Sequence, residues 1–321
     1  MQELKSALAE EQPRINEAMS RHIAELPDAA RPVAEHVFAA GGKRLRPFLT
    51  VMTGRALGCS RDGLYSLGAA VEMLHAATLL HDDILDNASL RRGKPAAHTV
   101  FAQAPVILAG DALLAKAMLV VSAFGDTRLT DCISLAVMRT AEGEIAEFDR
   151  LRDLDVSHED YLAMVTGKTA WMLRASCELG ALYAGASENL VRRAASFGLE
   201  LGIAFQMVDD ALDVSPAELT GKPRGGDIKE GKVTPPLRLY IDSLEPERAA
   251  AFRERFAAGS LGDDDVAAVS EAVCSGGFAD RTRDMAGERL ALAASALDAF
   301  PDSPERVVLR QMLSYIERRE R

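Results

Sequence analysis

Residues 67–86 read LGAAVEMLHAATLLHDDILD, an apolar stretch that ends in a run of aspartates. Apolar side chains recur in it at i, i+4 and i+7, as Leu67, Val71 and Leu74 show. This spacing places them on one face of an α-helix. The stretch therefore predicts a long, buried helix that carries acidic side chains at its C-terminal end.

The rest of the chain repeats this pattern. It is rich in Ala, Leu, Glu and Arg, which favour helix, and Val-rich alternating segments with hairpin turns are missing. Proline and glycine fall between the periodic segments, and no linker, repeat or shift in composition marks a boundary. The sequence predicts a large all-α helical bundle that forms a single domain over residues 1–321.

Composition excludes several classes of protein. Of the 321 residues 48% are hydrophobic, which rules out a disordered chain, and the net charge of −11 argues against a nucleic-acid binder. The four cysteines form no CxxC pair, so neither a zinc site nor a disulfide framework is expected. The first residues lack an apolar leader and no apolar run is long enough to span a membrane. We therefore expect a cytoplasmic protein without a membrane span.

Two acidic clusters carry the pattern DDxxD. The first is Asp82, Asp83 and Asp86, and the second is Asp209, Asp210 and Asp213. On a helix, residues i and i+4 share one face, whereas the middle aspartate stands about 100° away. A single DDxxD is typical of a solvated helix face, but two copies that each end an apolar helix are not.

Like charges one turn apart destabilise a helix, and the cost rises where neighbouring residues exclude water. A divalent cation would relieve it. Mg²⁺ is bound in proteins by a few carboxylates together with substrate phosphates. The two clusters therefore predict several Mg²⁺ ions that bridge one polyphosphate between them.

Basic residues gather next to turns and next to the acidic motifs. Arginine and lysine both bind phosphate oxygens. Each of these residues taken singly is typical of a surface charge, but their placement favours an anion site. The segments are GGKRLRP at 41–47, RRGKP at 91–95, GKT at 167–169, and Lys222, Lys229 and Lys232.

Four other patterns are rejected. Residues 226–233 nearly match a P-loop but end in Val233 where Ser or Thr should bind Mg²⁺, and residues 167–169 lack the upstream glycine. Glu72 and His75 form half of a di-iron signature, and no second copy exists. The acidic run 263–265 follows a glycine and predicts the start of a helix.

At this point the sequence resembles the all-trans polyprenyl (isoprenoid) diphosphate synthases. The resemblance spans most of the chain, and the motifs occur in the order of the family without a departure at a catalytic position. The matching segments are GGKRLRP (41–47), LLHDDILDNASLRRGKP (79–95), GKTA (167–170), FQMVDDALD (205–213) and GKPRGGDIKEGKVTPPL (221–237).

The resemblance implies an isoprenoid-synthase-type fold with a deep central cavity, and a homodimer. It also implies the reaction. An allylic diphosphate ionises, isopentenyl diphosphate attacks the allylic cation, and a proton is lost. Fixed cations would stabilise the charge that builds up on the leaving diphosphate, and the cavity must exclude water.

The family pattern implies a role for each matching residue. The six aspartates of the two DDxxD motifs would hold Mg²⁺, about three ions per site. Thr169 and Gln206 would lie near the cation. The allylic diphosphate would contact Arg91, Lys168, Lys222 and Lys232, and isopentenyl diphosphate would contact Gly42, Lys43, Arg46, His75 and Arg92. His81 is equally compatible with a supporting role and with a place in the core.

The growing apolar chain would occupy a cavity below the first aspartates, and the depth of this cavity would set the product length. By resemblance, the residue five positions before Asp82 points into it; here this is Ala77, with Thr78 beside it. Members that stop at fifteen carbons usually carry a bulky aromatic there. Ala77 therefore predicts a product longer than farnesyl, with Met73 and Leu74 one turn deeper.

Two other kinds of protein share part of this pattern. A class I terpene cyclase usually replaces the second DDxxD with an Asn/Ser/Glu triad and needs no site for isopentenyl diphosphate. A non-catalytic partner subunit typically loses aspartates from the motifs. The chain keeps all six aspartates and the GGKRLRP segment, which argues against both.

Overall fold

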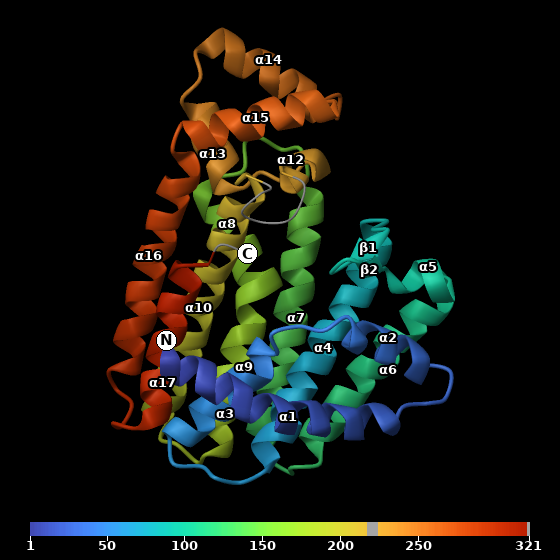
Figure 1. Cartoon of the computed structure of the whole chain (residues 1–321), viewed down its shortest axis with the longest axis vertical. Coiled ribbons are helices and arrows are strands. Elements are labelled where there is room, and N and C mark those ends of the chain that lie inside the picture. Colours follow the sequence, from blue (N-terminus) through green and yellow to red (C-terminus); the bar gives the residue numbers. More distant parts are fainter. Residues whose placement is uncertain (217–223, 320–321) are drawn as a thin grey trace. The chain divides into compact units, whose positions relative to one another are not determined.

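The structure is a computed structural model that describes residues 1–216 and 224–319. Within these residues nearly every element is a helix, and one short hairpin, β1 (Leu90–Arg91) with β2 (Lys94–Pro95), is the exception (Figure 1). The all-α prediction is confirmed. The hairpin was not predicted because strands of two residues are too short to show alternation.

The chain divides into two compact units, each assembled from segments that are distant in the sequence. Unit 1 consists of Met1–Val137, Met172–Ala195 and Ala299–Gln311, and unit 2 consists of Met138–Trp171, Ser196–Asp298 and Met312–Arg321. Neither unit is a contiguous piece of chain, so no single cut separates them. The expectation of one domain over residues 1–321 stays a prediction.

Most helices belong to one unit. Unit 1 contains α1 (Gln2–Ala24), α2 (Arg31–Ala39), α3 (Leu45–Ala56), α4 (Gly63–Leu85), α5 (Ala97–Phe101), α6 (Gln103–Ser122) and nearly all of α9 (Trp171–Tyr183). Unit 2 contains α8 (His158–Val165), the π-helix η1 (Thr166–Ala170), α12 (Gly226–Glu230), α13 (Pro235–Asp242), α14 (Pro246–Ala257), α15 (Asp263–Ser275) and α16 (Phe278–Leu297). Besides α9, which gives only Trp171 to unit 2, three of the described helices contribute several residues to both units: α7 (Thr127–Asp149), α10 (Glu188–Asp213) and α17 (Pro304–Glu317).

Helix α4 lies in the core of unit 1, packed against α1, α3 and α6. The side chains predicted to form its apolar face, Leu67, Val71 and Leu74, are at most 1% exposed. Burial of such a side chain stabilises the fold by roughly 1.5–3 kcal/mol. Its other faces carry small residues such as Ala69 and Ala76, which are also buried, so neighbouring helices cover α4 on several sides.

The acidic run 263–265 begins α15, as predicted. Gly262 is the N-cap residue, and its backbone N–H donates to the carboxylate of Asp265 at 2.9 Å. This contact and the positive end of the helix dipole account for the three aspartates.

Two glycines let α3 and α9 cross closely in unit 1. A Cβ atom added to Gly180 of α9 would meet the carbonyl oxygen of Thr50 and would lie 2.9 Å from the backbone nitrogen of Gly54. Both neighbours are backbone atoms of α3, which cannot rotate away as a side chain would. The crossing therefore requires glycine at position 180.

We expect Gly180→Ala to lower the free energy of unfolding by about 1–3 kcal/mol, because α3 and α9 must separate to admit the new methyl group. Gly287→Ala is the matched control, because nothing lies within 4 Å of a Cβ atom at that position of α16. Since alanine favours helix, the control should gain up to about 1 kcal/mol. Urea unfolding measures both; equal effects of the two substitutions would contradict the close crossing.

Candidate active site

The aspartates of each DDxxD motif occupy the C-terminal end of a helix. Asp82 and Asp83 lie in the last turn of α4, and the N–H of Asp86 donates to the carbonyl of Asp82 at 2.8 Å. Helical geometry thus extends through the motif, and Asp82 and Asp86 share a face as predicted. Helix α10 likewise ends at Asp213. The C-terminal end of a helix dipole is negative, so carboxylates are unfavourable there unless cations or donors compensate.

In unit 1 the middle aspartate of the first motif is paired with arginine. Asp83 is 3% exposed and accepts a hydrogen bond from Arg91 Nε at 2.7 Å. Arg91 Nη2 also donates to the same carboxylate oxygen. Arg91 stands at the end of β1, so the hairpin that the sequence did not reveal delivers this guanidinium to the end of α4.

The glycine pair before α3 makes room for a second arginine. Gly41 and Gly42 adopt φ angles of +80° and +144°, which side chains rarely allow. Arg92 donates to the carbonyl oxygen of Gly41, and a Cβ atom on Gly42 would lie 2.5 Å from Arg92 Nη1. Gly42, predicted to contact a diphosphate, therefore also sets how closely Arg92 approaches this loop.

Positive charges converge on His75 in unit 1. Burial lowers the pKa of His75 well below its usual value, and Arg46, Arg92 and Arg91 lower it further because they are close. Burial also lowers the pKa of Arg46, against the opposing effect of Glu72. The histidine is therefore neutral, and the cluster carries the charge of its arginines.

Two buried polar atoms of this cluster have no hydrogen-bond partner among the described residues, namely Arg46 Nε and Glu72 Oε2. The other oxygen of Glu72 accepts a bond from Arg44 Nη1 at 3.0 Å, and both side chains are less than 10% exposed. An orphaned guanidinium nitrogen beside a neutral histidine is the donor set of an anion site. Lys43, the remaining predicted contact, is exposed.

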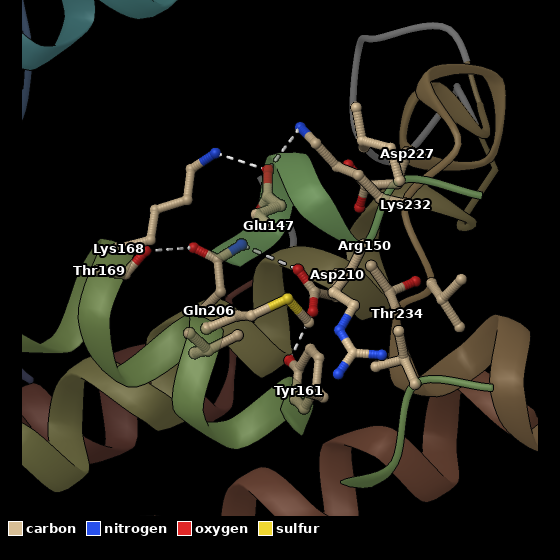
Figure 2. Close-up of a pocket in the computed structure, with 15 residues that line it drawn as sticks. Glu147, Arg150, Tyr161, Lys168, Thr169, Gln206, Asp210, Asp227, Lys232 and Thr234 are labelled. Carbon is tan, nitrogen blue, oxygen red and sulfur yellow. Dashed lines mark hydrogen bonds and ion pairs between the residues drawn. The ribbon is translucent and has the colours of Figure 1, made fainter. Parts of the chain in front are cut away.

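In unit 2 four polar side chains form a chain of hydrogen bonds. Thr169 Oγ1 donates to Gln206 Oε1 at 2.8 Å, Gln206 Nε2 donates to Asp210 Oδ1 at 2.8 Å, and Tyr161 donates to Asp210 Oδ2 at 2.6 Å (Figure 2). The predicted neighbours Thr169 and Gln206 are thus in direct contact. Both oxygens of Asp210 are held by side chains, so its role as a metal ligand stays a prediction.

Burial raises the pKa of Asp210 to about 7, although its bonds from Tyr161 and Gln206 lower it. The same cause, burial, raises the pKa of Asp213 and Asp227. Asp213 accepts the backbone N–H of Asp227 at 3.1 Å, and Asp209 pairs with Arg319 at 3.0 Å. Ionised carboxylates are costly in this cluster, and a cation would lower the cost.

The lysines predicted to bind diphosphate lie beside one glutamate of α7. Lys168 Nζ is 2.7 Å from Glu147 Oε1, and Lys232 Nζ is 3.6 Å from the same oxygen (Figure 2). Gly143 and Gly167 allow this arrangement, because a Cβ atom on either would collide with the backbone of the other. The π-helix η1, which carries Lys168, therefore lies against α7.

A pocket in unit 2 collects these residues. It is lined by Glu147, Lys168, Thr169, Gln206, Asp210, Lys232 and apolar side chains such as Met164 and Val165 (Figure 2). Its polar groups stand beside an apolar wall, an arrangement typical of a ligand site.

His81 has a structural partner in unit 1. Its Nε2 lies 3.1 Å from the carbonyl oxygen of Ile107 in α6. A Cβ atom on Gly110 would collide with the ring. The ring therefore ties the end of α4 to α6 next to Asp82, which is a supporting role.

The residues predicted to control product length lie on α4. Met73, Leu74 and Ala77 are at most 2% exposed, and Thr78 is partly buried with its hydroxyl bonded to the carbonyl of His75. Their role stays a prediction. Lys222, the remaining predicted site residue, lies outside the described residues.

No group of three His, Cys, Asp or Glu side chains gathers closely enough to hold a metal ion in the part of the chain that the structure describes. A Mg²⁺ site that relies on substrate phosphates needs only one or two carboxylates. The donor set at both helix ends, carboxylates separated by one turn, fits such an ion.

Sequence reasoning missed Tyr161, Glu147 and Asp227, and it considered Glu72 only as a metal ligand. Tyr161, Glu147 and Glu72 lie outside the DDxxD motifs and the basic segments, whereas Asp227 lies within the matching segment 221–237, of which only the lysines were assigned a role. The signal that could have found Asp227 is its place in that matching segment, whereas Glu147 stands in a polar, glycine-containing stretch, which is a weak signal.

Taken together, the features are those of all-α proteins that bind phosphorylated ligands with arginines, lysines and aspartate pairs. The model of the polyprenyl synthetase family matches residues 27–273. The chain therefore belongs to the polyprenyl synthetase family, and the resemblance drawn from its motifs is confirmed.

Relatives match the chain from end to end. The octaprenyl diphosphate synthase of Escherichia coli (strain K12) is 30% identical over 322 residues, covering 100% of this chain and 99% of its own. The geranylgeranyl diphosphate synthase of Methanosarcina mazei is 32% identical over 300 residues, covering 92% of this chain and 91% of its own.

A solved structure of a polyprenyl synthase from Caulobacter crescentus CB15, described as complexed with calcium and isoprenyl diphosphate, is also similar. It superimposes with a TM-score of 0.93 at 35% identity and covers 99% of this chain and 98% of its own. The isoprenoid-synthase-type fold predicted from the motifs is thereby confirmed.

The bond from Tyr161 to Asp210 yields a prediction on pH. The pKa of Asp210 is raised to about 7 in the folded protein, so the folded state binds more protons than the unfolded state below that pH. The free energy of unfolding of the metal-free protein therefore falls as pH rises from about 4 to 7. Tyr161→Phe removes a hydrogen-bond donor that stabilises the ionised carboxylate, so the pKa of Asp210 rises further. In this variant the free energy of unfolding therefore keeps falling to a higher pH than in the unchanged protein.

We expect Tyr161→Phe to cost about 1.5–3 kcal/mol of stability near pH 8, where it removes a bond to a charged group. The cost should be clearly smaller near pH 5, where Asp210 is protonated in both proteins. Urea unfolding in a metal chelator measures this. Tyr240→Phe is the control, because the Tyr240 ring packs on Phe278. A cost for Tyr161→Phe that does not change with pH would contradict the prediction.

Proposed function

We propose that this chain is a chain-elongating trans-prenyltransferase. It condenses isopentenyl diphosphate with an allylic diphosphate, releases diphosphate, and makes a polyprenyl diphosphate longer than farnesyl. The observation that carries this proposal is the pair of cation groups: Arg46 and Arg92 around neutral His75 in unit 1, and Lys168 and Lys232 beside Thr169 and Gln206 in unit 2. Two diphosphate substrates need two such groups.

We further propose Mg²⁺, about three ions per active site, as the cofactor. The carboxylates of Asp82 and Asp86, and those of Asp209 and Asp213, would hold the ions. When bound, Mg²⁺ acts as a Lewis acid that offsets the negative charge on the leaving diphosphate. Support comes from the position of both motifs at negative helix ends and from the raised pKa of Asp210 and Asp213.

The chain's own residues would divide the remaining work. Arg46, Arg92, Lys43 and the Gly42 loop would hold isopentenyl diphosphate, while Arg91, Lys168, Lys222 and Lys232 would hold the allylic diphosphate. Charges that are already in place stabilise the developing diphosphate anion without reorganisation. Thr169 and Gln206 would present oxygen atoms to the allylic cation, and apolar neighbours such as Met164 would exclude water from it.

The direct experiment is chromatography of the products that the purified chain makes from isopentenyl diphosphate, each candidate allylic primer and Mg²⁺. A prenyltransferase yields longer prenyl diphosphates only when isopentenyl diphosphate is present. A terpene cyclase would convert the allylic diphosphate alone, and a non-catalytic partner subunit would convert nothing. Either of the last two results would exclude the proposal.

The length of the product is proposed to depend on Ala77. The named relatives, an octaprenyl and a geranylgeranyl synthase, both take their names from products longer than farnesyl. Ala77 is 2% exposed, so a larger side chain there must project into space now used by its neighbours.

We expect Ala77→Phe to shorten the main product, because the ring would block the growing apolar chain. Product chain lengths are measured by chromatography under the same conditions as for the unchanged protein. Ala56→Phe, at a buried alanine of α3, is the control for a general effect of overpacking. An unchanged product distribution in Ala77→Phe would remove Ala77 from the proposal.

Helix α6 carries apolar side chains that unit 1 does not cover. Ile107, Leu108 and Leu119 are 42%, 66% and 64% exposed. By length and composition α4 and α6 could both cross a membrane, but 72% of the α4 window is buried, against 39% for α6. An exposed apolar patch of this kind marks an interface.

We propose that a second copy of the chain covers α6 in a homodimer in the cytoplasm, without a membrane span.

We expect Leu108→Glu to convert a dimer into a monomer, because a buried, unpaired carboxylate at an interface is costly. Leu292→Glu is the matched control, since Leu292 is 52% exposed on α16. Light scattering of both variants gives their masses. A dimer that persists in Leu108→Glu, or a protein that requires detergent to stay in solution, would contradict the proposal.

A further inference from the structure

One carboxylate oxygen in unit 2 holds two ammonium groups at once. Glu147 Oε1 lies 2.7 Å from Lys168 Nζ and 3.6 Å from Lys232 Nζ (Figure 2). The three residues come from α7, η1 and the segment after α12, and all three line the same pocket. No sequence motif pointed to Glu147, and the reaction proposed above does not use it.

The charges around the two lysines are already offset. Lys168 is also 3.0 Å from Glu144, and Lys232 is 2.6 Å from Glu230. Burial by itself would lower the pKa of Lys168 and of Lys232. Glu147 and its acidic neighbours outweigh this effect and raise both pKa values above the usual value of lysine, so both lysines stay charged. The two ammonium groups thus face Glu147, Glu144 and Glu230, and Asp227 is also close to Lys232. An arriving diphosphate therefore meets lysines whose charge is already offset by carboxylates.

Glu147 differs from Glu144 and Glu230 in its position. It lines the pocket next to Thr169, Gln206 and Asp210, whereas Glu144 and Glu230 do not contribute to the lining. The exposed fraction of its side chain is 24%, close to the 23% of Glu144, so Glu147 is set apart by its place in the pocket lining and not by its burial. A diphosphate that bridges Lys168 and Lys232 has to take the place that the Glu147 carboxylate holds.

We propose that Glu147 is a built-in competitor of diphosphate. In the free protein it pairs with both lysines and stabilises them against their mutual repulsion. When a diphosphate bridges the lysines, the same carboxylate is a repulsive neighbour, which weakens binding and promotes release of the product diphosphate. This inference rests on the proposed function, because it assigns Lys168 and Lys232 to the allylic diphosphate.

A supporting role for Glu147 predicts the opposite change in diphosphate affinity. If Glu147 only held the lysines in the correct position, or bound a metal ion together with Asp210, its loss would weaken diphosphate binding. A competitor predicts two effects that normally do not occur together. Glu147→Gln should make the free protein less stable, since two partly buried cations lose a partner, and should make the diphosphate complex tighter.

The test is calorimetric titration of Glu147→Gln with inorganic diphosphate in the presence of Mg²⁺. We expect binding about tenfold tighter than in the unchanged protein, since removing one neighbouring charge at an effective dielectric of 20 is worth at least this much. The midpoint of thermal unfolding without diphosphate should fall. In turnover, KM for the allylic substrate and kcat should both fall, because product release becomes slower.

Glu142→Gln is the matched control. It removes the same charge from the same helix, and Glu142 pairs with Arg139 at 2.7 Å with both side chains largely exposed. Its diphosphate affinity should equal that of the unchanged protein. Equal tightening in both variants would reduce the effect to net charge and overturn the proposal.

Unchanged or weaker diphosphate binding in Glu147→Gln would also overturn it. If the unchanged protein still elongates prenyl chains in that case, only the inference on Glu147 fails and the proposed function stands. If the unchanged protein neither elongates prenyl chains nor binds diphosphate, both fail.

Discussion

Carboxylates at the negative ends of two helices are the constraint on which the site depends. The last turn of α4 and that of α10 each carry aspartates where the helix dipole disfavours them. The protein holds some of them with its own donors: Arg91 on Asp83, and Tyr161 with Gln206 on Asp210. These contacts fix the middle aspartates and leave the electrostatic cost to be relieved by a cation.

The cationic residues likewise have partners of opposite charge within the protein. Arg44 is buried against Glu72, and Lys168 and Lys232 lie against Glu147, so charges that would destabilise an empty site are paired within the protein. Pairing stabilises the fold, yet each carboxylate reduces the attraction for a phosphorylated ligand. The affinity for a phosphorylated ligand therefore depends on whether the ligand can displace these carboxylates from the cationic side chains.

Much of the fold follows from local sequence, and much of the site does not. The apolar period of residues 67–86 indicates α4, and the glycine before residues 263–265 indicates the start of α15, because helix periodicity and capping act within a few residues. The DDxxD and GGKRLRP segments similarly predicted the family, which the match over residues 27–273 confirms. In contrast, Tyr161 meets Asp210 across 49 positions and Lys168 meets Glu147 across 21, and no local pattern encodes such pairs. The sequence also did not predict that α6 exposes apolar side chains, since periodicity does not tell which apolar face lacks a partner.

The hairpin that follows α4 sends two adjacent arginines to different partners. Arg91, at the end of β1, reaches back to Asp83, while Arg92, with φ at +52° in the turn, reaches the carbonyl of Gly41. Their assignments depend on the number of residues between the last turn of α4 and the hairpin. Inserting or deleting one residue there would shift both guanidinium groups by one position relative to Asp83 and Gly41. Natural variation in length should therefore be absent from residues 87–92, even though they form a surface loop of the kind that usually tolerates insertions.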